Sequence, residues 1–165
     1  MTWLTHTIFA GTTAHVLGLD PYIAMLGSTA PDWTEDLFGI NEHRGITHYL
    51  IIWFPALAIT FLLFLAHTPL SLEILSFTYG AGTHLFLDSL TPSGVPIKGK
   101  TRIRVGGLIK TGKLSEWIFL GLLVLFSAPL LKLDAKLGYT KYKDLYDRGV
   151  IDLKEYNERK FKIWE

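Results

Sequence analysis

The chain has 165 residues, the length of one ordinary domain, and 49% of them are hydrophobic. Its mean hydropathy of +0.29 is high for a soluble protein and indicates a membrane protein. The absence of cysteine excludes disulfides and thiolate metal ligands, so any metal must be bound by His, Asp, Glu or backbone oxygen.

The net charge of +1 hides an uneven distribution along the chain. Residues 1–97 contain seven acidic residues and one basic residue, Arg44, whereas residues 98–113 contain six basic residues and no acidic one. The N-terminal apolar run lacks the basic start of a signal peptide and is expected to remain as a helix.

Five apolar segments predict helices, in chain order at 2–19, 21–30, 46–66, 72–90 and 114–131. At 1.5 Å per residue, 46–66 is long enough to cross a bilayer core of roughly 30 Å. Segments 46–66 and 114–131 are predicted to span the membrane, and so is 72–90, whereas the first two form a shorter hairpin. The predicted fold class is therefore all-α, an integral membrane bundle of about five hydrophobic helices.

The segment between 91 and 113 contains Pro and Gly residues that exclude a helix. The alternation in TRIRV, followed by Gly106–Gly107, predicts a short β-hairpin at the membrane surface that turns at the glycine pair. Residues 132–165 are predicted to form a separate helix, a turn and a second helix. Asp152 is the expected N-cap of that second helix, with Glu155 three residues on.

Polar side chains recur at the ends of the apolar segments that the connectivity brings to one side of the bundle. Ionisable groups beside membrane spans are costly, so they are usually paired or functional. His84 and Asp88 are four residues apart and share a helix face. The candidate metal ligands are His6, Asp32, His43, His48, His84 and Asp88.

Four His and two Asp without Cys suit Zn²⁺ best, with Mn²⁺ or Fe²⁺ as alternatives, and fit Ca²⁺ poorly. Six ligands exceed the need of one tetrahedral zinc and are enough for a two-metal site. Each also has a plainer reading, such as an N-cap for Asp32 or an exposed loop residue for His43. His43 and His48 would lie about 140° apart on a helix, so sharing an ion requires His43 in the loop and His48 in the first turn. Gly45 is expected to let that loop turn.

Basic and acidic residues near these ligands complete the predicted site. Arg44 is expected to stabilise a developing anion, and Glu42 is a candidate general base, whereas Glu35 and Asp36 are expected to be solvated. The basic hairpin either binds a substrate phosphate or anchors to anionic lipid. Its candidate substrate-binding residues are Lys98, Lys100, Arg102 and Arg104.

Three sequence blocks resemble the membrane-bound metal-dependent hydrolases, the LexA-regulated inner-membrane family typified by YdjM. They are APD at Ala30–Asp32, HRGITH at His43–His48 and GTHLFLDSLTPSGVP at Gly82–Pro96. The resemblance covers about residues 1–120 and implies a small helical inner-membrane protein with metal-dependent hydrolase activity. Thr34 stands where the family often has a second Asp, and Tyr49 where Ser is common. By position, the resemblance implies the site residues His6, Asp32, His43, Arg44, His48, His84 and Asp88.

The C-terminal segment is similar to the short module called SHOCT, through LYDRGVIDLKEYNERKFKIW. The predicted organisation is a membrane-embedded domain at 1–131 and a SHOCT-like tail at 132–165. That resemblance implies self-association or a protein partner bound through residues 134–165.

Two classes of function are consistent with these patterns. The first is a hydrolase in which a metal-activated water attacks a phosphate or other ester of a lipid or lipid-linked substrate. The second is a non-catalytic membrane scaffold, or a metal- or proton-handling protein, that recruits partners through its tail. Nucleic acid is not an expected partner, because the basic hairpin lacks interleaved aromatic residues.

Overall fold

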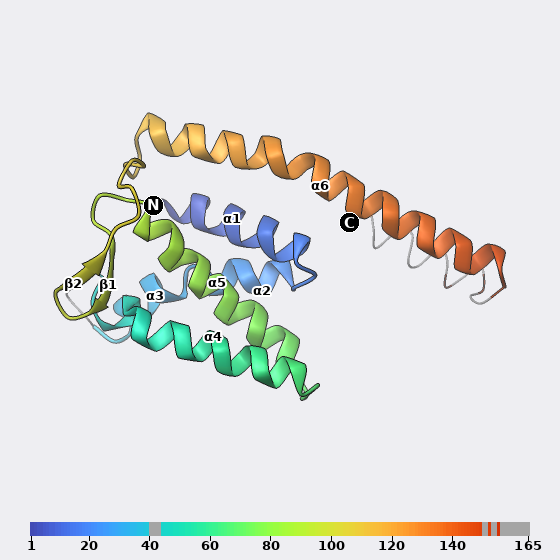
Figure 1. Cartoon of the computed structure of the whole chain (residues 1–165), viewed down its shortest axis with the longest axis horizontal. Coiled ribbons are helices and arrows are strands. Elements are labelled where there is room, and N and C mark those ends of the chain that lie inside the picture. The colour runs from blue at the N-terminus through green and yellow to red at the C-terminus, as the bar shows by residue number, and fades with distance from the viewer. Residues whose placement is uncertain (40–43, 150–151, 153–154, 156–165) are drawn as a thin grey trace. The chain divides into compact units, whose positions relative to one another are not determined.

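The computed structural model describes residues 1–39, 44–149, 152 and 155, apart from the side chains of 130–146. Two compact units are present, Met1–Leu123 and Val124–Glu165. The described part is mostly helical, as predicted, with one small antiparallel sheet (Figure 1). Its elements are α1 (Trp3–Val16), α2 (Pro21–Gly27), α3 (Ala30–Leu37), the 3₁₀-helix η1 (Ile46–His48), α4 (Leu50–Leu65), α5 (Ser71–Ser89), β1 (Val95–Lys98), β2 (Thr101–Ile103) and α6 (Leu114–Asp147).

Helix α5 is the central element of the first unit. It packs against α1, α2, α3 and α4, and Figure 1 shows it running between α1 and α4. Its small residues, including Gly80, Ala81 and Thr83, are buried and let neighbouring helices approach closely. Because α5 packs against α1 and α3, which carry predicted ligands, its own polar side chains meet theirs.

A glycine pair sets the distance between α2 and α5. A Cβ added at Gly80 would lie 2.0 Å from the carbonyl oxygen of Ala24, and one added at Gly27 would lie 2.0 Å from that of Phe77. Only glycine is compatible with such an approach of two backbones. The contact brings the C-terminal end of α2, with Ser28, directly against the face of α5.

Side-chain caps fix where the first two helices begin. Asp20 Oδ1 accepts a hydrogen bond from the amide of Ile23 at 2.9 Å, and Pro21 occupies the first turn of α2. Thr2 caps α1, and Glu116 at the start of α6 accepts from the Thr2 amide at 2.6 Å. The entry of α1 into the core is therefore held at a fixed position, which in turn positions His6.

The predicted spanning helix at 46–66 is wrong. Residues 46–48 form η1, Tyr49 is extended, and α4 then contains 16 residues, a length of about 24 Å against a core of roughly 30 Å. Among the described helices, none combines the length and the apolar sequence needed to cross a membrane. The predicted span at 114–131 forms the start of α6, whose side chains are described only as far as Pro129.

The predicted β-hairpin exists, but its strands and turn differ from the prediction. Val95 pairs with Ile103 and Lys98 with Thr101, so the chain turns at Gly99–Lys100. Gly99 has φ +57°, a left-handed conformation that glycine adopts without strain. The predicted turn at Gly106–Gly107 is wrong, because residues 95–98, which contain a proline, form the partner strand.

The C-terminal region begins with a continuous helix. Helix α6 runs from Leu114 to Asp147 without a break at the predicted domain boundary of 131/132, which stays a prediction. Asp152 Oδ1 accepts from the amide of Glu155 at 2.7 Å, so the predicted N-cap contact is confirmed. The rest of the predicted second helix of the tail lies outside the described residues.

Candidate metal centre

Five predicted ligands from four elements meet beside the central helix. His6 comes from α1, Asp32 from α3 and His48 from η1, while His84 and Asp88 lie one turn apart on α5. The four residues other than Asp32 are buried. The convergence predicted from connectivity is thus present for every one of these described candidates, although their roles stay predictions.

Asp32, His48 and His84 form the tightest triangle of potential donor atoms. His48 Nε2 lies 3.2 Å from His84 Nε2 and 3.2 Å from Asp32 Oδ1, and His84 Nε2 lies 3.6 Å from Asp32 Oδ1. Donors bound tetrahedrally to zinc at about 2.1 Å are separated by about 3.4 Å. The triangle therefore has the dimensions of one face of a coordination tetrahedron.

A hydrogen-bonding partner on the far side of each donor fixes its orientation. Glu35 Oε1 lies 2.9 Å from His48 Nδ1, and the Ser28 carbonyl lies 2.7 Å from His84 Nδ1. The Trp3 indole donates to Asp32 Oδ2 at 2.6 Å, which leaves Oδ1 facing the histidines. Outer partners of this kind are typical of metal-binding histidines and carboxylates.

These partners also decide which nitrogen carries the proton. A carboxylate and a carbonyl only accept hydrogen bonds, so Nδ1 of His48 and of His84 is the protonated nitrogen. In the neutral imidazole, Nε2 then presents a lone pair, and the two Nε2 atoms face each other at 3.2 Å. A divalent cation satisfies both lone pairs and the Asp32 oxygen together, which a single proton cannot do.

Burial and neighbouring charges shift the pKa values in the direction that metal binding requires. Burial lowers the pKa of His84 to about 3, so the imidazole is neutral. Burial alone would raise the pKa of Asp32, but its contact with His48 and the proximity of His84 lower it to about 2, so the carboxyl is ionised. Neutral imidazole and ionised carboxylate are the states that bind a metal.

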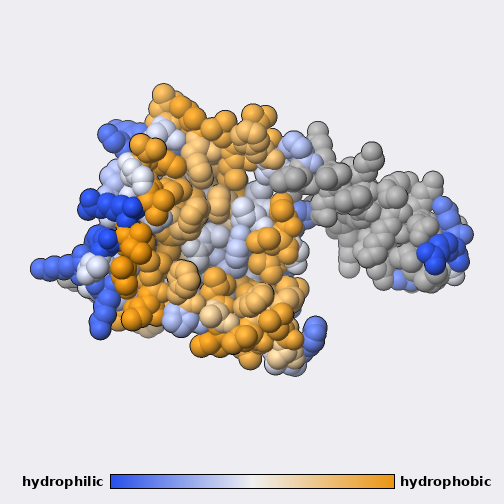
Figure 2. All heavy atoms as spheres, in the orientation of Figure 1, coloured by the Kyte–Doolittle hydropathy of each residue, from blue (hydrophilic) through white to orange (hydrophobic). Residues whose placement is uncertain are grey.

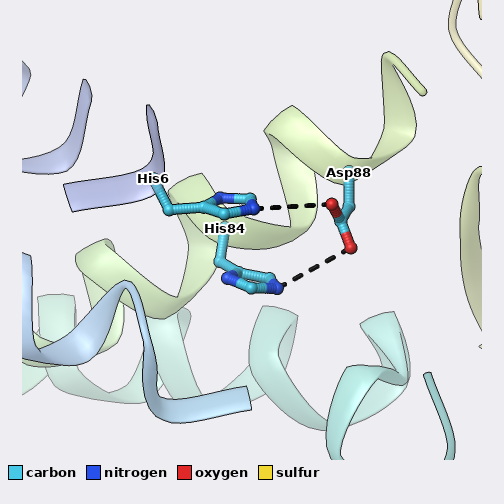
Figure 3. Close-up of side chains that lie close together, drawn as sticks. All are labelled: His6, His84 and Asp88. Atoms are coloured by element: carbon cyan, nitrogen blue, oxygen red, sulfur yellow. Dashed lines mark ion pairs between the residues drawn. The ribbon is translucent and has the colours of Figure 1, made fainter. Parts of the chain in front are cut away.

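A second group of donors adjoins the triangle through His84. His6 Nε2 lies 3.5 Å from Asp88 Oδ1, and His84 Nε2 lies 3.7 Å from Asp88 Oδ2 (Figure 3). The imidazole rings of His6 and His84 stack with centroids 3.9 Å apart. Burial lowers the pKa of His6, although its hydrogen bond to Asp88 opposes this shift.

Asp88 is already neutralised by two cations. The amino group of Met1 lies 2.8 Å from Oδ1 and the Arg44 guanidinium 3.0 Å from Oδ2. Burial would raise the pKa of this carboxyl, but hydrogen bonding to His6 and the surrounding positive charges hold it well below its ordinary value. Asp32 contacts His48, His84 and the Trp3 indole, and among the described residues no arginine, lysine or amino group, so it has more negative charge to offer an ion.

The two groups share one nitrogen, which limits how many ions they bind. His84 Nε2 belongs to both groups, and Nδ1 of the same ring is hydrogen-bonded to Ser28. One imidazole lone pair binds one ion, so the two groups cannot both be complete at once. Within the described residues, the geometry supports one three-ligand ion at Asp32, His48 and His84.

Arg44, the predicted anion-stabilising residue, is a buried connector between the loop, α5 and the hairpin. Its Nη1 donates to the Gly94 carbonyl at 2.7 Å, and its Nη2 faces Asp88. Its Nε is buried and has no hydrogen-bond partner among the described residues. The left-handed backbone conformation of this loop belongs to Arg44, with φ +63°, and not to Gly45, which has φ −75°.

The remaining predicted site residues do not join the cluster or fall outside the description. The four hairpin cations are exposed, and the Arg102 guanidinium donates to the Ser93 carbonyl at 3.3 Å. Glu42 and His43 lie outside the described residues, so the geometric condition on His43 stays a prediction. His48 is the last residue of η1, two residues before α4 begins.

Sequence reasoning missed the residues that orient the ligands. Glu35, expected to be solvated, is 5% exposed and also accepts from the Gly45 amide at 2.8 Å. A usable signal existed, because Glu35 follows Asp32 by three residues and so shares its helix face. Trp3 and Ser28 carry no comparable signal, since their contacts depend on how α1 and α2 pack.

Comparison with known proteins identifies the family of this chain. No curated protein and no solved structure matches the chain. A family model described as "YdjM inner membrane protein" matches residues 1–135, which include every ligand described above. The chain therefore belongs to the YdjM inner membrane protein family.

Proposed function

We propose that this protein is a membrane-bound metal-dependent hydrolase. The observation that carries the proposal is the triangle of Asp32, His48 and His84, in which each donor is fixed by an outer partner. Oriented donors at metal-ligand spacing are costly to bury without a cation between them. Membership of an inner-membrane family supports its association with the membrane.

The donor set fits a catalytic zinc ion best. Two imidazoles and one carboxylate are the ligand types of several hydrolytic zinc sites, which keep a fourth position open. Mn²⁺ and Fe²⁺ also accept this set. The Asp32 side chain is 16% exposed, which gives the site access to the surface. When bound, such an ion supplies Lewis acidity and lowers the pKa of a coordinated water.

The neighbouring His6 and Asp88 supply a route for a proton. The lowered pKa of His6 keeps its imidazole neutral. Its Nε2 faces the Asp88 carboxylate at 3.5 Å and donates to it, so the nitrogen able to accept a proton is Nδ1, which has no hydrogen-bond partner among the described residues. Asp88 then stabilises the imidazolium that results. The arrangement resembles a base–carboxylate pair, with Arg44 keeping Asp88 ionised.

Arg44 offers the donor that a developing anion needs. Its two outer nitrogens are committed to Gly94 and Asp88, whereas its buried Nε–H remains without a partner among the described groups. A pre-positioned donor in a buried site stabilises transition-state charge without reorganisation. We therefore assign to the site the hydrolysis of a phosphate or other ester, carried by a lipid or lipid-linked molecule at the membrane surface.

Metal analysis of the purified protein tests the first half of the proposal. Protein in detergent, stripped with a chelator and reloaded with Zn²⁺ or Mn²⁺, is expected to retain one ion per chain by mass spectrometry of the metal. The reloaded protein is then incubated with bis(p-nitrophenyl) phosphate and with phosphatidic acid vesicles, and we expect product release that the chelator abolishes.

His15→Ala provides a matched control, because it removes an imidazole from the exposed end of α1 and leaves the cluster unchanged. This variant should retain metal and activity, whereas Asp32→Ala should lose both. Equal metal content in Asp32→Ala and His15→Ala would contradict the metal site. Bound metal without hydrolysis of any ester would contradict the hydrolase.

A further inference from the structure

A long apolar groove runs along the faces of α4 and α5. One hollow of about 320 Å³ lies at the hairpin end, where Val95 and Ile103 line it. A second hollow of about 520 Å³ lies at the other end, where Leu17 and Leu19 line it. Both are lined by Phe54, Leu57 and Tyr79, so the two hollows adjoin.

The groove has the length of a lipid acyl chain. Along α4 it extends from Leu50 to Phe64, a distance of about 21 Å at 1.5 Å per residue. One leaflet of a bilayer core is about 15 Å thick, half of the whole core. A complete acyl chain therefore fits between the two helices.

This groove is separate from the metal cluster. Gly82 and Phe86 of α5 line the groove, whereas His84 lies on the cluster side. Residues two apart on a helix point about 160° away from each other, since each residue turns the helix by about 100°. A molecule in the groove thus contacts the opposite face of α5 from a substrate at the metal.

Exposed cations stand at the hairpin end of the groove. Ile103 lines the groove, with Arg102 before it in β2 and Arg104 directly after the strand. Lys98 ends β1 and Lys100 lies in the turn. All four are exposed, and no acidic residue occurs between 98 and 113. Figure 2 shows hydrophilic residues gathered at this end beside a hydrophobic surface.

We propose that the groove is a binding site for one anionic phospholipid. An acyl chain lies between α4 and α5, and the phosphate of the headgroup lies against Lys98, Lys100, Arg102 and Arg104. An apolar groove that ends in cations with no ion pair among the described residues has the charge and shape of such a lipid, and membership of an inner-membrane family supports contact with lipids. The hairpin cations then bind a resident lipid, which goes beyond the proposed hydrolase.

Native mass spectrometry with defined lipids tests this site. Protein in detergent is titrated with phosphatidylglycerol or phosphatidylcholine of the same acyl chains. We expect one retained phosphatidylglycerol per chain and a preference over phosphatidylcholine of more than about tenfold. Neutralising the four hairpin cations to glutamine is expected to reduce this preference to near unity. Inorganic phosphate at millimolar concentration should not displace the lipid, because it lacks the acyl chain.

A groove-filling variant separates the acyl contact from the charge. An added Cβ at Gly82 meets only Leu57 Cδ2, at 3.7 Å, so the side chain of Gly82→Leu enters the groove. We expect Gly82→Leu to weaken the binding of both phosphatidylglycerol and phosphatidylcholine at least about fivefold, because part of the apolar contact is lost. Gly121→Leu, at a position with nothing within 4 Å, should leave lipid binding unchanged.

A matched loss of charge elsewhere completes the design. Neutralising Lys132, Lys136, Lys141 and Lys143 removes the same net charge and should leave the lipid preference intact. Unchanged preference in the hairpin variant, or unchanged binding in Gly82→Leu, would overturn the proposal. Metal content is measured in parallel. It should stay at the wild-type value in the hairpin variant and in Gly82→Leu, whether or not the hydrolase proposal holds.

Discussion

Replacing Gly80 by alanine is expected to destabilise the protein by about 3 kcal/mol, because the new methyl group overlaps a backbone. The added Cβ would lie 2.0 Å from the Ala24 carbonyl oxygen and 2.8 Å from the Ser28 amide nitrogen. Neither atom is the end of a flexible side chain, so α2 as a whole must move away from α5. Thermal unfolding in detergent, followed by circular dichroism, measures the loss.

The same displacement should impair the metal centre. The Ser28 carbonyl, which holds His84 Nδ1 at 2.7 Å, is attached to the part of α2 that must move. His84 lies one helical turn after Gly80 on the same face of α5. We therefore expect Gly80→Ala to bind metal less tightly even at temperatures where it remains folded.

Gly82→Ala in the same helix is the matched control. Its added Cβ makes an ordinary contact of 3.7 Å with Leu57. Alanine favours a helix over glycine by up to about 1 kcal/mol, so this variant should be slightly more stable than the wild type. The two substitutions should thus change stability in opposite directions. Equal melting temperatures for both variants would show that the close approach of α2 and α5 does not limit stability.

The sequence predicted the convergence of ligands better than it predicted the elements that hold them. His84 and Asp88 could be paired from their spacing of four, and connectivity alone brought His6, Asp32 and His48 to the same side. These inferences need only the helical period and the order of the segments. They therefore survive errors of several residues in the helix boundaries.

What depends on the packing between elements could not be read from the sequence. The length of α4 depends on Tyr49, which is extended and separates η1 from the helix, although the residues after it are as apolar as a membrane span. In the hairpin, Val95 pairs with Ile103, so the chain turns at Gly99, which has a left-handed conformation. The turn is not at the more conspicuous pair Gly106–Gly107. In both places the local pattern predicted the wrong alternative, and the structure formed by tertiary contacts differs from it.

The residues that orient the ligands also differ in whether the sequence could have revealed them. Trp3 reaches Asp32 across 29 residues and Ser28 reaches His84 across 56, and neither contact has a periodic signal. Glu35 differs, because its position one turn after Asp32 places it toward the same side of α3. An acidic residue in that position is informative once its neighbour is suspected to be a ligand.

Glu35→Gln is expected to weaken metal binding by about 10- to 100-fold, the usual effect of losing a carboxylate that orients a metal-binding histidine. Glutamine keeps an oxygen that can accept from His48 Nδ1, from the Gly45 amide and from Thr47, so the loop stays in place. It lacks the negative charge that makes the imidazole a stronger donor. Competition against a chromophoric chelator measures the affinity for Zn²⁺ directly.

Asp36→Asn isolates the effect of orientation from that of net charge. Asp36 is the next residue of α3 and is exposed, so its substitution removes the same charge without touching His48. This control should bind Zn²⁺ as the wild type does, whereas His84→Ala, which loses a ligand, should bind least. A purely structural role for Glu35 would lower the melting temperature of the metal-free protein and leave the affinity of the folded protein unchanged. Equal affinities in Glu35→Gln and Asp36→Asn would therefore show that Glu35 does not position His48 for the metal.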